Sequence, residues 1–199
     1  MKKQTLTTFL LFLISYSYSQ KVEVLIEETN LNHNGVSLGV HVTDDYIIYS
    51  KKKESKKKEA SYNLYSAKVI DSTTFDVENA TELKEVNITF NNGSPSVFED
   101  ELYYTSNSGL DDEYFENQET EFTVNKSGEN TLQIFISKRD EKGDWKFPTY
   151  ASFSNIEHNF TTPFITNDGS KLYFASDKPG GFGGYDIYVS LRQDDNSWG

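Results

Sequence analysis

An internal repeat constrains this chain more than any single residue does, because self-similarity decides the architecture of a whole fold. The clearest copy has a short apolar run at residues 162–166, the turn Asn167-Asp168-Gly169 and a second run at 172–176. A glycine-rich connection then leads to a third run at 186–190. Runs of this length, rich in Tyr, Phe, Ile, Val and Thr, are typical of β-strands. The copy predicts three antiparallel strands in sequence order.

Two further copies precede this one, and helical periodicity is nearly absent from the chain. Their runs lie at 94–98, 102–106 and 133–137, and, in a weaker form, at 39–42, 46–50 and 63–66. A bulky aromatic residue follows the last run of every copy: Trp198 lies eight residues after Ser190, Trp145 eight after Ser137 and Phe75 nine after Ser66. The chain is therefore predicted to be all-β.

The residues that define the repeat are interpreted as structural. They are Pro95, Trp145, Pro163, Asp168, Gly169, Ser176, Asp177, Gly180, Gly181, Gly183, Gly184, Asp186 and Trp198. This pattern resembles the WD40-like repeat of TolB-type β-propellers. Its glycine-rich version is similar to repeats in cell-envelope proteins of the Bacteroidota, of the kind found in outer-membrane protein A family proteins.

The resemblance implies β-propeller blades of antiparallel strands. The approximate units are 36–87, 88–157 and 158–199, after an N-terminal lead-in at 20–35. Propellers usually carry four to eight blades, so about three units predict an incomplete propeller, truncated at its C-terminal end. Alternatively, a chain with only three blades is complete in itself and borrows further blades from a partner.

The N-terminus predicts export. Lys2 and Lys3 precede an apolar stretch from Leu6 to Ile14, and small residues follow before Gln20, which is the order of a secretory signal peptide over residues 1–19. The apolar stretch is too short for a membrane helix, so no integral membrane span is expected. The expected location is the periplasm or the outer membrane.

Charge and cysteine content exclude some classes of partner and of stabilisation. The formal net charge is −12 at pH 7, and such a surface repels nucleic acid, so no nucleic-acid partner is expected. The chain has no cysteine, which excludes disulfides and a cysteine nucleophile.

We expect no catalytic residue, no cofactor and no metal. Asp177 and Asp186 flank the glycine loop and offer oxygen ligands for calcium, but the favoured role of each is to cap a turn. The loop around Gly184 is expected to need backbone angles that only glycine tolerates, and it lacks the helix of a phosphate-binding loop. The histidines have no metal-binding spacing; they are His33, His41 and His158.

Two charged segments are expected to be loops. The lysine cluster at 51–58 is interpreted as a solvated loop between strands, with contact to an anionic polymer as the alternative. The acidic run at 111–121 matches no calcium loop and is interpreted as a disordered insertion between two strands. The long loops near residues 51–61 and 107–131 are the predicted binding segments.

The predicted function is a non-catalytic β-propeller module that mediates protein or glycan binding, or scaffolding, in the periplasm or at the outer membrane. Envelope proteins or peptidoglycan-associated partners are the expected ligands, with a glycan as a further option. The alternative is the propeller part of an exported hydrolase, a glycoside hydrolase or a peptidase, whose catalytic domain is not in this chain. Propellers host many activities, so the fold alone does not decide between them.

Overall fold

The computed structural model describes residues 27–32, 39–53, 61–88, 91–107 and 124–199. Within these ranges the chain forms strands and one short 3-10 helix, without an α-helix. The elements are η1 Asn30–Asn32, β1 Val40–Val42, β2 Tyr46–Lys53, β3 Ser61–Lys68, β4 Thr81–Glu82, β5 Gly93–Phe98, β6 Glu101–Ser106, β7 Gln133–Lys138, β8 Thr149–Tyr150, β9 Phe160–Ile165, β10 Lys171–Ser176 and β11 Asp186–Leu191. The all-β prediction is confirmed.

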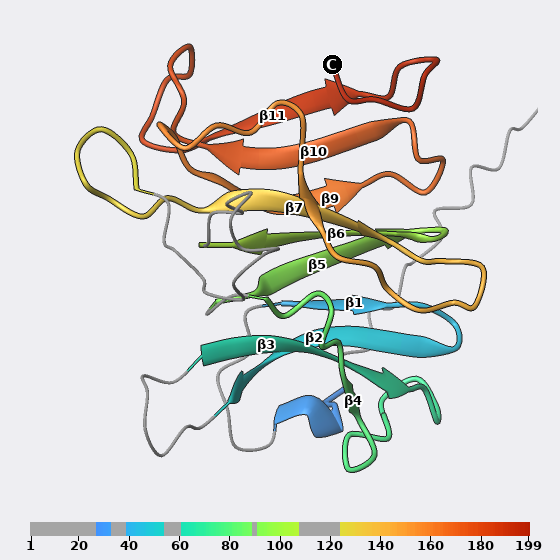
Figure 1. The fold of residues 1–199 in the computed structure, drawn as a ribbon. Coiled ribbons are helices and arrows are strands. Elements are labelled where there is room, and N and C mark those ends of the chain that lie inside the picture. The colour runs from blue at the N-terminus through green and yellow to red at the C-terminus, as the bar shows by residue number, and fades with distance from the viewer. Residues whose placement is uncertain (1–26, 33–38, 54–60, 89–90, 108–123) are drawn as a thin grey trace, which may run out of the picture.

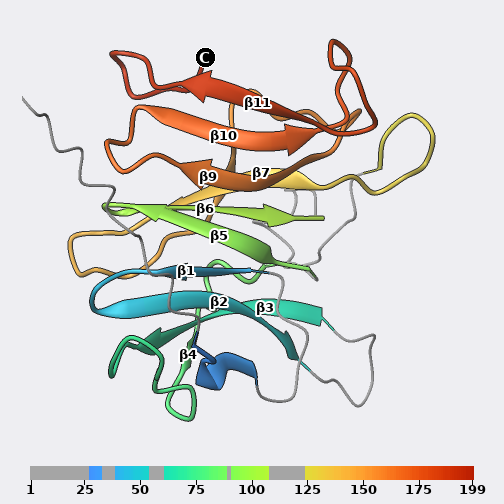
Figure 2. The ribbon, with the colours of Figure 1, turned by 180° about the vertical axis from the view of Figure 1, so that it is seen from behind.

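The strands form three sheets, and every pairing between named strands is antiparallel. The first sheet has the order β1-β2-β3-β4, the second β5-β6-β7-β8 and the third β9-β10-β11. Each sheet is thus a meander of strands that are consecutive in the sequence. Figures 1 and 2 show the sheets stacked in chain order, with the first at the bottom and the third at the top.

The aromatic residues that follow the third strands occupy one equivalent position. Isolated antiparallel bridges join Val69 to Phe75, Arg139 to Trp145 and Arg192 to Trp198. We call the first residue of each pair the bridge residue. Counting from these bridges along the ladders makes Ile47, Leu102 and Leu172 equivalent. The repeat is therefore a repeat of structure as well as of sequence.

In the first copy, the strand pairing is shifted by one residue from the alignment that the sequence repeat suggests. Ser50, Ser106 and Ser176 each end a predicted second strand, but the ladder aligns Lys51 with Ser106 and Ser176. Strand β2 also continues to Lys53, so Lys51 to Lys53 belong to a strand and not to the predicted loop. They pair with Ser61 to Asn63 of β3, and their exposed side chains keep the charges in water.

Each sheet turns its aromatic position toward the preceding sheet. Trp145 packs with Ile48 and Tyr104 between the first and second sheets. Trp198 packs with Tyr103 and Leu172 between the second and third. Burying one large apolar side chain contributes about 2–3 kcal/mol, so these interfaces supply much of the stability. The first strand of each sheet lies at one of its edges, and there β5 contacts both β1 and β9. We call β1, β5 and β9 the inner strands.

Within the described residues no sheet precedes the first one, and Asn30 and Leu31 of η1 cover part of its outer face. Leu31 of η1 packs on the cluster that contains Ile47 and Phe75. The side chain of Asn30 donates to the backbone oxygen of Phe75 at 2.6 Å and accepts from its backbone nitrogen at 2.9 Å. This end of the stack is closed by a specific cap.

Membrane insertion through a helix finds no support in the described residues. None of their helical segments is long and apolar enough to cross a bilayer. The predicted signal peptide at 1–19, His33 and the acidic run at 111–121 lie outside the described residues.

Candidate functional site

The candidate site is the outer side of the third sheet, which we call the open face. It consists of Phe164, Lys171, Tyr173, Ile187, Val189 and Leu191. In the ladder Tyr173 lies opposite both Phe164 and Val189. Because paired residues of neighbouring strands project to the same side, these side chains form one continuous patch. The open face belongs to the third sheet, which lies at the top of the stack in Figures 1 and 2.

Two of these positions are fully buried on the second sheet. Tyr173 is 36% exposed, whereas the equivalent Tyr103 of the second sheet is fully buried. Ile187 is 74% exposed, and the equivalent Ile134 is fully buried. A contiguous apolar patch on a chain with a net charge of −12 is unusual for a solvated surface. This contrast makes the open face the candidate contact surface of the described residues.

The open face is also less polar than its equivalent on the second sheet. There, the hydroxyl of Thr105 accepts from the backbone nitrogen of Thr162 at 2.9 Å. The hydroxyl of Ser96 accepts from the backbone nitrogen of Ile165 at 3.0 Å. The equivalent residues on the third sheet are Ala175 and Phe164, which have no hydroxyl.

A shallow hollow of about 420 Å³ lies at the hairpin end of the open face, bordered by Phe164, Asp168, Lys171 and Tyr173. Asp168 accepts hydrogen bonds from Thr166 at 2.6 Å and from the backbone and side chain of Ser170. These bonds lower the pKa of Asp168 to about 2. Asp168 is therefore ionised at neutral pH and is held in its own turn.

An ion-pair cluster joins the second sheet to the third. It lies beside the hairpin between β5 and β6, which corresponds to the hairpin end of the open face. Glu101 accepts from Arg192 at 2.6 Å, from Lys138 at 2.8 Å and from the hydroxyl of Tyr103. Burial alone would raise the pKa of Glu101, but these hydrogen bonds outweigh it and lower the pKa to about 2. A carboxylate held in this form is a poor general acid, and its role here is to link two sheets.

The bridge residue of each later sheet reaches back to one position on the preceding sheet. Arg192 lies over the ring of Trp198 at 4.6 Å and contacts Glu101. Arg139 lies over the ring of Trp145 at 4.5 Å and over Tyr46 at 4.9 Å. In the ladder Tyr46 and Glu101 are equivalent, and their counterpart on the open face is Lys171.

Reading the sequence for chemistry overlooked Glu101, Arg139 and Arg192. Their signal was present, since an arginine precedes Trp145 and Trp198 by the same interval. The two tryptophans themselves are buried, at 9% and 8% exposure. They are part of the packing between sheets, which agrees with their structural interpretation.

The predicted turn residues are confirmed in part. Gly169 has φ +68°, the left-handed conformation expected of the Asp168-Gly169 turn. In the glycine loop only Gly180 has a positive φ, of 109°. A Cβ on Gly184 would meet no atom within 4 Å, so the expectation that Gly184 needs glycine-only angles is wrong. Gly183 is similarly open, whereas a Cβ on Gly181 would overlap the side chain of Asp186.

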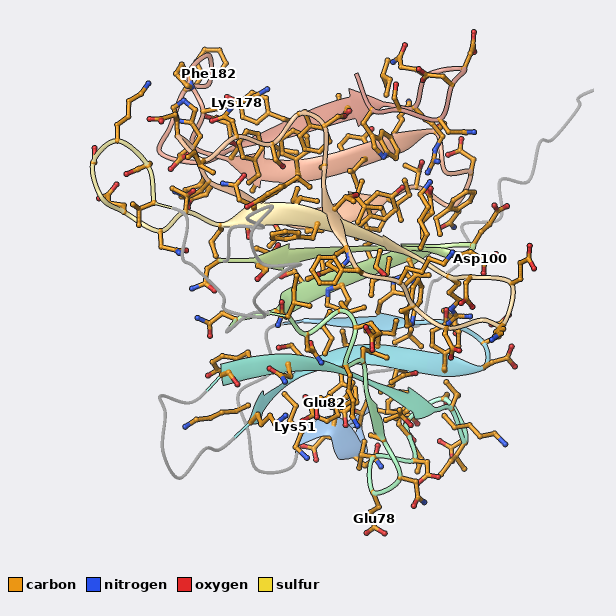
Figure 3. The ribbon with its side chains drawn as sticks, in the orientation of Figure 1. Lys51, Glu78, Glu82, Asp100, Lys178 and Phe182 are labelled. Carbon is orange, nitrogen blue, oxygen red and sulfur yellow. The ribbon has the colours of Figure 1, made fainter. Side chains whose placement is uncertain are left out.

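The two aspartates around this loop have different roles. Asp186 accepts from the backbone nitrogen of Gly183 at 3.0 Å, so it caps the turn as predicted. Asp177 instead accepts from the backbone and side-chain nitrogens of Asn159, at 2.7 and 2.6 Å. It joins the loop to a distant segment, and its predicted role as a local cap is wrong. Phe182 in this loop is fully exposed, whereas Nζ of Lys178 lies over the ring of Tyr188 at 4.3 Å (Figure 3).

Pro95 and Pro163 lie within β5 and β9, each after a residue with a positive φ: Ser94 at 48° and Thr162 at 49°. Both strands shift register there, as in a β-bulge. The prolines therefore lie inside the inner strands and do not begin them. Ser176 is buried, and its hydroxyl accepts from the backbone nitrogen of Lys178 at 3.1 Å.

The remaining candidates stay separate in space. Lys53 pairs with Glu82 at 2.7 Å, and Lys51 and Glu82 lie near the base of the stack in Figure 3. Burial lowers the pKa of His41, and His158 lies 4.0 Å from Asp177. Across the part of the chain that the structure describes, no three His, Asp or Glu side chains gather as a metal site would require.

Comparisons with known proteins add little to this geometry. The fold and the open face define an all-β protein of three stacked antiparallel sheets. No family model matches the chain, and no curated protein matches it. Among solved structures it is similar to the crystal structure of alpha-L-arabinofuranosidase from Lactobacillus brevis, with 13% sequence identity and a TM-score of 0.45. The match covers 86% of this chain and 57% of that one, and it carries no argument about function.

Proposed function

We propose that the chain is a non-catalytic binding or scaffold module whose contact surface is the open face. The observation that carries the proposal is the contrast between Tyr173 and Ile187, which are exposed, and their buried equivalents on the second sheet. Exposed aromatic and aliphatic side chains on a rigid sheet bind a protein at little cost in ordering. The expected partners are envelope or peptidoglycan-associated proteins.

We further propose that the three sheets are consecutive blades of a β-propeller. Two features support this arrangement: the inner strands β1, β5 and β9 adjoin, and each sheet turns the same face toward its predecessor. Closed propellers need four to eight blades, so further sheets would complete the ring. The signal-peptide pattern at residues 1–19 supports a place for the module at the cell envelope.

The absence of cysteine from the natural chain allows a direct test of the open face. A single Val189→Cys substitution places one thiol on this face, and Glu78→Cys places one on an exposed turn at the other end of the stack (Figure 3). In purified residues 20–199 both thiols should react quickly with a maleimide. In intact envelopes of cells that make the full-length protein, the thiol at 189 should react at least tenfold more slowly. Equal protection or equal reactivity of the two thiols in envelopes would exclude the open face as the contact surface.

A further inference from the structure

The two interfaces inside the molecule follow one rule, and that rule predicts what covers the open face. At each interface the covering sheet brings an aromatic residue and the bridge residue beside it. Trp145 and Arg139 cover the first sheet, and Trp198 and Arg192 cover the second. The open face offers the same positions a third time, so its surface fits a sheet of the same plan.

A second copy of this chain does not supply such a surface through its first sheet. The aromatic position there is Phe75, which is 4% exposed and belongs to the cluster on which Leu31 packs. The amide of Asn30 also holds both backbone groups of Phe75. Head-to-tail stacking of two copies would have to remove this cap first. The geometry thus favours a sheet that is not capped.

The charge at one position sets a further condition. The bridge residue of the covering sheet meets Tyr46 at the first interface and Glu101 at the second. Both accept a guanidinium, Tyr46 through its ring and Glu101 through its carboxylate. The open face has Lys171 at this position, and a buried arginine beside a lysine would be repelled.

We propose that the open face binds a further antiparallel β-sheet of the same repeat, with an acidic bridge residue in place of Arg192. This inference rests on the proposed contact surface and names its occupant. The acidic residue pairs with Lys171, so the polarity of the Glu101–Arg192 pair is reversed. Phe164 and Ala175 make the rest of the contact apolar, because they replace the hydroxyl groups that serve the second interface.

A chain that carries a second copy of its last sheet tests this occupant. The structure shows at which residue the second copy can be appended. Ser190 donates to the backbone oxygen of Gly199 at 3.1 Å, and the equivalent Ser137 donates to that of Lys146. Gly199 is therefore equivalent to Lys146, and residues 147–199 can be appended directly after Gly199. The appended segment brings a strand like β8 and a complete third sheet. One version keeps its Arg192, and the other carries Arg192→Glu in the appended copy only.

The reporter is the thiol of Val189→Cys in the first copy, with Glu78→Cys as the control. The appended Arg192→Glu copy should slow labelling at 189 by at least tenfold, and the unchanged copy should slow it much less. Adding Lys171→Glu to the first copy should reverse this preference, because it restores the Glu101–Arg192 arrangement. Labelling at 78 should not change. Hydrogen exchange in the appended strands shows in each version whether that sheet has formed.

Three results would overturn the inference. Appended copies that protect position 189 equally, whatever the charges, exclude the acidic condition. Appended copies that leave it reactive exclude a sheet of this repeat as the occupant. A chain without any appended copy that is already protected and has the mass of a dimer assigns the face to a second copy. In that last case the proposed contact surface stands and its proposed occupant falls.

Discussion

Arg192 of the third sheet donates a hydrogen bond of 2.6 Å to Glu101 of the second, and its guanidinium lies over the ring of Trp198. The two side chains are only 16% and 14% exposed. The pair is thus part of the core between two sheets. Four predictions follow from contacts at this interface and at the turns beside it.

Glu101→Gln should lower the free energy of unfolding by about 2–4 kcal/mol, because it leaves Arg192 partly buried without its carboxylate. Urea unfolding of the two proteins measures the difference. The matched control is Glu157→Gln, whose partner Lys126 is 3.8 Å away at the surface. The control should cost less than about 0.5 kcal/mol. Similar losses for both variants would mean that the Glu101 cluster contributes no more than a surface pair.

The Glu101 cluster should also make stability depend on pH at the acid end. The pKa of Glu101 is about 2 in the fold, below its ordinary value of 4.5. A lowered pKa stabilises the fold above pH 4.5, and this contribution is lost as the pH falls toward 2. The difference in unfolding free energy between the natural chain and Glu101→Gln should therefore shrink over this window. A constant difference would show that Glu101 titrates normally.

Gly169→Ala should cost about 2 kcal/mol more than Gly143→Ala. Both glycines have a positive φ, of 68° and 84°, so both variants carry the same backbone strain of about 1 kcal/mol. Only at Gly169 would the new Cβ collide with a neighbour, since Cε1 of Phe98 would be 2.2 Å away. A Cβ at Gly143 meets nothing within 4 Å. Thermal unfolding of both variants measures the difference, and equal costs would place Phe98 elsewhere.

Glu99→Gly should stabilise the fold by about 0.5–1 kcal/mol, because Glu99 has φ 50° in the hairpin between β5 and β6. The same change at Glu141 should have the opposite sign. Glu141 lies in a turn without a positive φ, so glycine there adds only freedom to the unfolded chain. Denaturant unfolding of the pair is the measurement. Destabilisation by Glu99→Gly would contradict the strained turn.

The sequence predicted the strands well because alternation of buried and exposed residues determines them locally. The runs at 162–166, 172–176 and 186–190 agree with β9, β10 and β11 to within two residues at each end. The lysines at 51–53 were predicted to lie in a loop because a run of charged residues is typical of a loop. Their place in a strand depends on pairing with β3, which the local sequence does not indicate. Turn chemistry was predictable at Gly169, where one residue must take a positive φ, and not in the longer loop around Gly184.

The open face could not be predicted from composition or motifs. Tyr173 and Tyr103 occupy the same place in the repeat, and only the stacking order makes one exposed and the other buried. The partnership of Glu101 with Arg192 joins positions 91 residues apart, which spacing within one repeat does not reveal. The exchange of Ser96 and Thr105 for Phe164 and Ala175 has meaning only once the ladders fix which residues correspond.

The cap that Asn30 and Leu31 form on the first sheet makes the two ends of the stack chemically unlike. At one end a hydrogen-bonded amide holds Phe75, which is buried, and at the other end Ile187 and Val189 are exposed to solvent. A sheet that joins the molecule through apolar contact therefore adds at one end only.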